Sequence, residues 1–279
     1  MPDREKDVVL YEVAGSIANV TLNRPRYRNA QSYHLLDELD AALDRAVADD
    51  NVMVIVLRGA GGNFSSGHDL GTPEAIAYRE ELGIPNEGIG WYEAFRHYNL
   101  DITFKWRNLP KPTIALVEGF CIFGGWMIAA SMDLVFAHKD ALFLPALLEY
   151  PSVPWDISPR KAKEICFESR FLSANEAMAL GFVNRVYDTV EDLERETRQY
   201  ALRVAENSRV GLRMTKLSIN KAQDLQGYAA GMEGGFADYL VMSLQRGVGR
   251  SEGARRLGAV DLALRGLRGE RPGLKPGEG

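Results

Sequence analysis

The sequence predicts an α/β fold whose final third is helical. Two continuous apolar runs, at residues 52–57 and 112–117, have the composition of strands buried on both faces of a sheet. Each run leads into a glycine-bearing turn, at residues 64–70 and 119–127, and each turn opens a helix-compatible segment. Residues 190–247 are helical in composition throughout. Alternating strands and helices are typical of α/β domains, and the final helices form a separate element for packing or assembly.

The chain begins with a predicted hairpin and helix. Residues 8–11 and 17–22 are rich in apolar and β-branched side chains, and a Gly-Ser pair between them is a turn signal. Apolar residues then recur at helical spacing over 32–47, with Ser32 as the N-cap. Residues 71–100 are polar and aromatic with several prolines and glycines, which predicts a flexible insertion or lid that leads into a helix. This segment is our candidate for substrate selection.

The second half of the chain is predicted to contain three more short strands and two capped helices before the long helical region. The strands fall at 133–137, 141–144 and 183–187. One helix begins at Pro159 behind Ser158, and the next follows the capping box at 173–176 and ends near Gly181.

The bulk composition is that of a globular protein with a large core, since 46% of the 279 residues are hydrophobic and 25% are charged. We divide it into a core over 1–205, a helical assembly region over 206–268 and a disordered tail over 269–279. The formal net charge is −5 and the Lys and Arg residues are scattered, so nucleic acid is not an expected partner. Without a membrane-spanning stretch or a secretion signal, we expect a cytoplasmic protein.

The two glycine-bearing turns carry the strongest chemical signal. Two such turns can aim two backbone N–H groups at one oxygen, which is the construction of an oxyanion hole for a carbonyl or thioester. Two competing motifs are incomplete: residues 58–64 place Phe64 where a dinucleotide-binding G-x-G-x-x-G needs its third glycine, and residues 63–67 lack the first glycine of a serine hydrolase G-x-S-x-G.

The histidines and cysteines suggest no metal or thiol chemistry. His34, His97 and His138 form no metal-ligand pattern. Cys121 and Cys166 lie among apolar neighbours, and we interpret both as small buried hydrophobes.

In the order and spacing of its motifs, the chain resembles the enoyl-CoA hydratase/isomerase superfamily, also called the crotonase family. The resemblance runs from residues 18–25 and 29–30, through both turns, to residues 173–186. It implies a crotonase-like spiral of ββα units with a helical C-terminal region that assembles trimers or dimers of trimers. It also implies an acyl-CoA thioester as the ligand, with coenzyme A as part of the substrate and no separate cofactor or metal.

The resemblance assigns roles to individual residues. The backbone N–H groups of Ser66 and Gly124 would form the oxyanion hole. The stretch 26–28 would approach the CoA phosphates, or its arginines could simply be solvated, and the stretch 66–69 would line the pantetheine and adenine path. The implied substrate contacts are Arg26, Tyr27, Arg28, Ser66, Gly67, His68, Asp69, Trp126, Met127 and Leu147.

The acid and base groups differ from those of the family. Its hydratases use two glutamates, and the matching positions are Met127 and Leu147, neither of which can move a proton. The chain is therefore a divergent member. The bulk of Trp126 and Met127 predicts a narrow or unusual acyl pocket.

Three nearby groups are candidate replacements. Asp156 is preferred, because divergent dehalogenase-like and β-diketone-hydrolase-like members carry a functional aspartate there, although it could instead cap the next helix. Glu149 lies close to the second glutamate position, but a small register shift would reverse its face. His68 is a candidate because histidine is the side chain most often used for proton transfer near neutral pH, or it could stabilise its turn.

These residues leave alternative functions open. The nominal function is that of an enoyl-CoA hydratase, a lyase of fatty-acid or related acyl-CoA metabolism. The alternatives are a C–C hydrolase or dehalogenase-like enzyme that uses Asp156, and a catalytically weak acyl-CoA binder.

Overall fold

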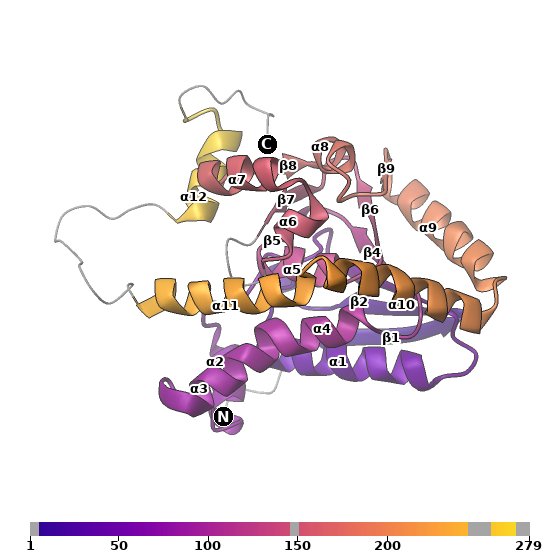
Figure 1. The fold of residues 1–279 in the computed structure, drawn as a ribbon, viewed down its shortest axis with the longest axis horizontal. Coiled ribbons are helices and arrows are strands. Elements are labelled where there is room, and N and C mark those ends of the chain that lie inside the picture. Colours follow the sequence, from indigo (N-terminus) through magenta and orange to yellow (C-terminus); the bar gives the residue numbers. More distant parts are fainter. Residues whose placement is uncertain (1–5, 146–150, 245–257, 272–279) are drawn as a thin grey trace.

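A computed structural model describes residues 6–145, 151–244 and 258–271 (Figure 1). Its centre is a six-stranded sheet in the order β1-β2-β3-β4-β6-β9, beside a three-stranded sheet in the order β5-β7-β8. The strands of the larger sheet are β1 (Val9–Ala14), β2 (Ile17–Leu22), β3 (Val54–Gly59), β4 (Thr113–Val117), β6 (Leu134–His138) and β9 (Arg185–Tyr187). Those of the smaller sheet are β5 (Phe120–Ile122), β7 (Leu142–Leu144) and β8 (Leu172–Ser173).

Helices cover both faces of the larger sheet. In the buried strand β3, Ile55 and Leu57 belong to the main core with α1 (Tyr33–Ala48), whereas Val54 and Val56 pack in a second core with α9 (Val190–Ala205). This alternation follows from the two-residue period of a strand, and it explains why the run is apolar throughout. The α/β architecture predicted from the sequence is confirmed.

The residues predicted to begin three of the helices are confirmed at those positions. The Ser32 side chain accepts a hydrogen bond from the N–H of Leu35 and caps α1. In the capping box, the Ser173 side chain accepts from the N–H of Glu176 at the start of α8 (Ala174–Ala179). The helix α7 (Pro159–Glu168) begins at the proline.

The segment 71–100, for which the sequence predicts a flexible insertion or lid, is mostly helical, and the helix expected to follow it is present. It contains α2 (Pro73–Glu81) and α3 (Gly88–Arg96), and a π-helical turn (His97–Asp101) leads into α4 (Ile102–Arg107). The hydroxyls of Tyr78 and Tyr98 both donate to Oδ2 of Asp37 on α1, at 2.8 and 3.0 Å. The prolines and glycines mark helix ends, and these tyrosines fix the segment on α1.

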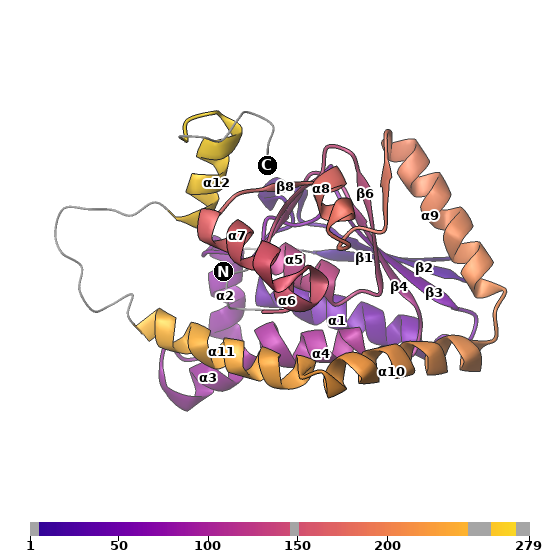
Figure 2. The same ribbon diagram turned by 45° about the horizontal axis from the view of Figure 1, so that its top comes forward.

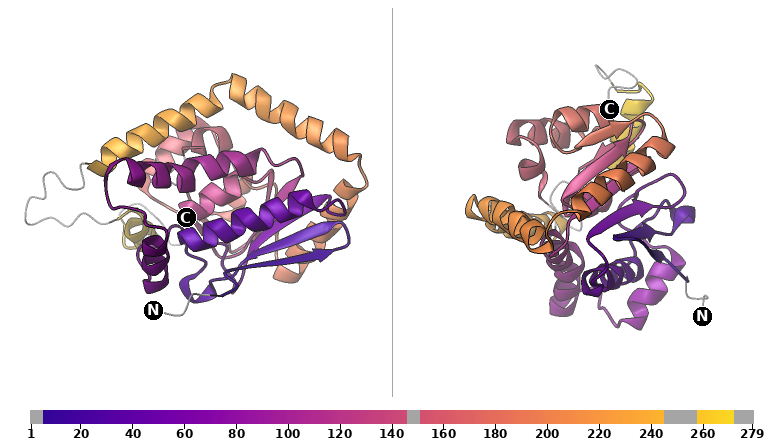
Figure 3. Two further views of the ribbon diagram at one scale, coloured as in Figure 1. Left: turned by 90° about the horizontal axis from the view of Figure 1, so that it is seen from below. Right: turned by 90° about the vertical axis from the view of Figure 1, so that its right-hand side faces the viewer.

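The C-terminal helices extend beyond the sheets. The helices α10 (Arg209–Leu225) and α11 (Tyr228–Leu244) meet at an angle and run past α4 (Figures 2 and 3). The helix α12 (Ala259–Leu267) instead contributes Ala263 to a small core with Ile122, Leu144 and Phe171. Within the expected tail, Arg271 donates to the carbonyl oxygens of Glu168 and Ser169, and residues 272–279 lie outside the described part.

Among the described residues, no helix combines the length and apolar character needed to cross a membrane. The same residues hold no group of three His, Cys, Asp or Glu side chains arranged for a metal ion.

A buried ion pair ties the loop after β2 to the beginning of α2. The guanidinium of Arg24 donates to Asp69 at 2.8 Å, and both side chains are at most 1% exposed. Asp69 also accepts hydrogen bonds from the N–H groups of Gly71 and Thr72. Burial alone would raise the pKa of Asp69, but the hydrogen bonds from Thr72, Gly71 and Arg24 hold that pKa below its usual value.

We expect Asp69→Asn to lower the free energy of unfolding by about 3–5 kcal/mol at neutral pH, because it removes one partner of a buried ion pair. Since the pKa of Asp69 is lowered in the folded state, its contribution is present above the unfolded pKa of about 4 and is lost as the pH falls through the folded value. Urea denaturation at neutral and acidic pH measures both effects.

The control is Asp50→Asn, at a surface ion pair with Arg209 in which the aspartate side chain is 97% exposed. This variant should lose less than about 1 kcal/mol. Equal losses in the two variants would contradict the buried role of Asp69.

Candidate active site

The two glycine-bearing turns lie in direct backbone contact. Ser65 pairs with the β5 region, since its N–H donates to the carbonyl of Phe120 and its carbonyl accepts from the N–H of Ile122. At Gly67, whose φ is +91°, an added Cβ would lie 2.8 Å from the carbonyl oxygen of Ile122 and 3.5 Å from the nitrogen of Gly124. Only glycine permits this approach. The sequence prediction that the two turns converge therefore has a physical basis in the structure.

The N–H of Ser66 is not directed at this convergence. It donates to the carbonyl oxygen of Arg28 at 2.9 Å, so its assignment as an oxyanion donor does not fit the structure. The peptide between Gly67 and His68 has a different orientation, because the carbonyl of Gly67 accepts from the N–H of Gln31. In a trans peptide the C=O and the N–H point in opposite directions, so the N–H of His68 points away from Gln31. That direction is the side on which Ser65 pairs with β5.

The second turn ends at α5 (Gly124–Ala130). The N–H of Met127 makes a helical hydrogen bond to the carbonyl of Phe123, and the N–H of Gly124 lies ahead of that bond, at the open end of the helix. Phe123 adopts φ 46° and ψ −102°, a conformation that side chains rarely take. The backbone of this turn is therefore held in a strained form next to Gly124.

Asp156 lies beside α5 and is bound by two side chains. It is the last residue of α6 (Val153–Asp156), and its Oδ2 accepts hydrogen bonds from Ser152 Oγ at 2.6 Å and from Trp126 Nε1 at 3.0 Å. Trp126 is fully buried and its ring stacks on Phe182 with centroids 3.7 Å apart. The carboxylate is therefore hydrogen-bonded to the indole of Trp126, a side chain of α5, and it is not engaged in capping α7.

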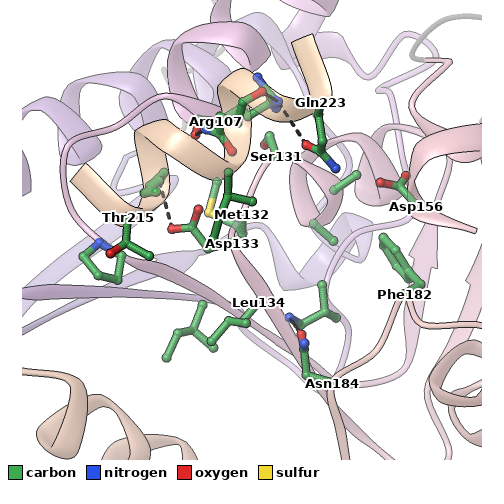
Figure 4. A pocket seen from close by; sticks show the side chains of 18 of the residues that line it. Arg107, Ser131, Met132, Asp133, Leu134, Asp156, Phe182, Asn184, Thr215 and Gln223 are labelled. Carbon is green, nitrogen blue, oxygen red and sulfur yellow. Dashed lines mark hydrogen bonds and ion pairs between the residues drawn. The ribbon is translucent and has the colours of Figure 1, made fainter. Parts of the chain in front are cut away.

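The environment of Asp156 favours its protonated form. Burial raises the pKa of Asp156 to about 7, although the hydrogen bonds from Ser152 and Trp126 oppose that rise. Asp156 and Phe182 form part of the wall of a cavity of about 500 Å³, to which Arg107 on α4 and Gln223 on α10 also contribute (Figure 4). A carboxyl group with such a pKa can either accept or donate a proton near neutral pH.

Of the two positions that match the family glutamates, the structure describes only Met127. Met127 is fully buried in the main core, where its thioether has no acid or base function. Leu147 and Glu149 lie within residues 146–150, outside the described part of the chain.

The predicted CoA-contacting residues divide into two groups. Arg26 and Arg28 are exposed, and their guanidinium groups lie 5.1 Å from the ring centroid of Tyr27 and 5.7 Å from that of Phe120. The Tyr27 hydroxyl lies 3.2 Å from a carboxylate oxygen of Glu74. By contrast, the Asp69 side chain is enclosed by its partners within the protein, which corrects its assignment as a substrate contact.

Sequence reasoning missed two residues that the structure places at the site. Ser152 precedes Asp156 by four residues, a helical spacing that could have indicated the contact. Gln31 lies between the two turns, and its position after the Asn29-Ala30 motif gave no comparable signal.

Comparison with known proteins identifies the family. A family model described as enoyl-CoA hydratase/isomerase matches residues 12–234. A Mycobacterium tuberculosis protein named as an enoyl-CoA hydratase, EchA13, is 37% identical over 256 residues, which cover 84% of this chain and 80% of that protein.

Solved structures agree with this match. A Mycobacterium smegmatis structure named as an enoyl-CoA hydratase is 42% identical with a TM-score of 0.71, covering 82% of this chain and 91% of its own. One from Mycobacterium thermoresistibile, also named as an enoyl-CoA hydratase, is 38% identical with a TM-score of 0.73, covering 86% of this chain and 100% of its own. The chain therefore belongs to the enoyl-CoA hydratase/isomerase family of the crotonase superfamily.

Proposed function

We propose that this enzyme stabilises the enolate of an acyl-CoA thioester between the N–H groups of His68 and Gly124, and that Asp156 moves the proton. The observation that carries the proposal is the carboxylate of Asp156, which is bound by Trp126 on α5 and has a pKa of about 7. A base with a pKa near the working pH combines a useful ionised fraction with sufficient basicity.

The backbone geometry of the two turns supports the choice of the His68 and Gly124 N–H groups as the donors. The N–H of Ser66 is engaged by Arg28, and the peptide that follows Gly67 directs the N–H of His68 away from Gln31. Gly124 lies against Gly67, which brings the second donor close to the first turn. Donors fixed in this way stabilise the charge that develops on a thioester oxygen, and loss of one such donor typically costs about 100- to 1,000-fold in rate.

The chemical step that follows is a proton transfer. The Asp156 carboxylate removes a proton from the carbon next to the thioester carbonyl, or from the γ-carbon of an enoyl chain. The electron pair of the broken C–H bond moves toward the carbonyl, and the negative charge collects on the thioester oxygen. Return of the proton to the same carbon gives exchange, and return to the other carbon shifts the double bond.

A single carboxylate suits this chemistry better than hydration. Hydration across a double bond needs one group to activate water and another to protonate carbon, and Met127 removes the first family position. Isomerisation needs only one group that accepts and then donates. We therefore favour an isomerase-type reaction on an unsaturated acyl-CoA, with Arg26, Tyr27 and Arg28 directed to the CoA phosphates.

We also propose a trimer or a dimer of trimers, in the cytoplasm. Large apolar side chains are exposed along α10, including Val210 at 69%, Met214 at 54% and Ile219 at 60%. Surfaces of this kind favour protein contacts. Light scattering of the purified protein would measure the assembly.

We expect Asp156→Asn to reduce exchange of the α-protons of butyryl-CoA in D₂O by at least about 100-fold, because an amide cannot accept the proton. For the wild type, the kcat/KM of exchange should rise as the pH increases through about 7, since the carboxylate form of Asp156 is the active one. Mass spectrometry of the recovered thioester measures the exchange.

Three companion experiments separate the alternatives. Asp140→Asn, at an exposed aspartate, is the matched control and should retain the wild-type rate. Hydration of crotonyl-CoA, measured for the wild type and for Glu149→Gln, tests whether the protein is a hydratase. Exchange that survives in Asp156→Asn but disappears in Glu149→Gln would reject Asp156 as the proton carrier.

Ser152 sets the pH at which Asp156 ionises. Its hydroxyl stabilises the ionised carboxylate of Asp156, so Ser152→Ala should raise the pKa of Asp156 further. The midpoint of the pH–rate profile for exchange should move upward by about one unit, the scale of one hydrogen bond to a charged group. Ser152→Thr, which keeps the hydroxyl, should restore the wild-type midpoint, and an unchanged profile in Ser152→Ala would contradict the assignment.

A further inference from the structure

Gln31 lies between the two turns that carry the donors and contacts both of them. Its N–H donates to the carbonyl of Gly67 at 2.8 Å, and its carbonyl accepts from the N–H of Asp69 at 3.0 Å. Its side chain, in a residue that is 3% exposed, donates from Nε2 to Ser65 Oγ at 3.1 Å. Gln31 is therefore joined to the first turn through both its backbone and its side chain.

The other end of the amide faces the second turn. A Cβ added to Gly124 would lie 2.3 Å from Gln31 Oε1, so the amide oxygen packs against the Cα of the donor residue itself. Oε1 is buried, and it has no hydrogen-bond partner among the described residues. A buried acceptor without a partner loses its hydration without compensation, whereas an apolar side chain of the same size would avoid that cost.

We propose that Gln31 is a positioning residue of the oxyanion hole: its amide spans the two turns and sets the separation of the His68 and Gly124 N–H groups. This inference rests on the proposed function. The Nε2 end fixes Ser65 Oγ, which in turn accepts from the N–H of Gly67, the residue before His68. The Oε1 end contacts Gly124.

Gln31→Leu separates this role from a purely structural one. In the variant, Ser65 Oγ still donates to the carbonyl of Asn29 at 2.8 Å and still accepts from the N–H of Gly67 at 3.2 Å. The substitution therefore creates no new unpaired polar group, and it removes the unpaired Oε1. We expect a melting temperature equal to or above that of the wild type, together with weaker enolate stabilisation.

The experiment measures the acidity of bound acetoacetyl-CoA, whose enolate absorbs in the near ultraviolet. The full-length wild type should lower the pKa of this ligand below that of the free thioester, and this readout needs no proton transfer by Asp156. In Gln31→Leu, stabilisation of the enolate should fall about tenfold, less than for loss of a whole donor. The dissociation constant of butyryl-CoA, which carries no enolate, should change less than threefold.

A double-mutant cycle with Ser65→Ala tests the path through the first turn. If the Gln31–Ser65 contact transmits the effect, the double variant should lose less enolate stabilisation than the sum of the two single losses. Gln199→Leu, at an exposed glutamine on α9, is the control for the same chemical change and should match the wild type.

The outcomes are distinguishable. If the wild type lowers the pKa of acetoacetyl-CoA and Gln31→Leu lowers it equally, the role of Gln31 is overturned and the proposed oxyanion hole is retained. Strictly additive losses in the cycle would overturn the path through Ser65. A wild type that binds acetoacetyl-CoA without lowering its pKa would overturn the proposed function and this inference with it.

Discussion

The close approach of two backbones at Gly67 is the constraint on which the site depends. The chain that leaves β3 must pass within van der Waals distance of the chain that enters α5, and a side chain at residue 67 would prevent it. The Asn29 side chain holds the chain segments that lead into the first turn. It accepts a hydrogen bond from the N–H of Arg24 and donates to the carbonyls of Ala60 and Asn63. The strand order of the larger sheet places the two turns next to each other, and these hydrogen bonds fix the distance between them.

The fold could be predicted from the sequence because its signals are local. A cap such as Ser32 acts within one helical turn, and the apolar run of β3 specifies a strand with two buried faces. The helices within the 71–100 segment were not predicted, because they are held by distant partners. Tyr78 and Tyr98 both donate to Asp37, and no pattern within the segment reveals that contact.

The site was predictable only in part, for the same reason. The pattern of the first turn indicated an oxyanion donor, but which N–H points to the second turn depends on the pairing of residues 28–31, and this pairing assigns the N–H of Ser66 to Arg28. Asp156 was found among the candidates, yet its contact with Trp126 joins residues 30 positions apart in the sequence. This contact joins α6 to α5 only in the folded chain, and no single segment specifies it.

The shared carboxylate of Asp37 also limits how the 71–100 segment can move. Because one oxygen accepts from both Tyr78 on α2 and Tyr98 near the end of the segment, two points of the 71–100 segment are held at the same position on α1. Swinging the whole segment outward would break both bonds and leave the carboxylate without either phenol. An outward movement of the whole segment therefore loses two hydrogen bonds at once, and a single carboxylate couples the position of α2 to that of the residues that lead into α4.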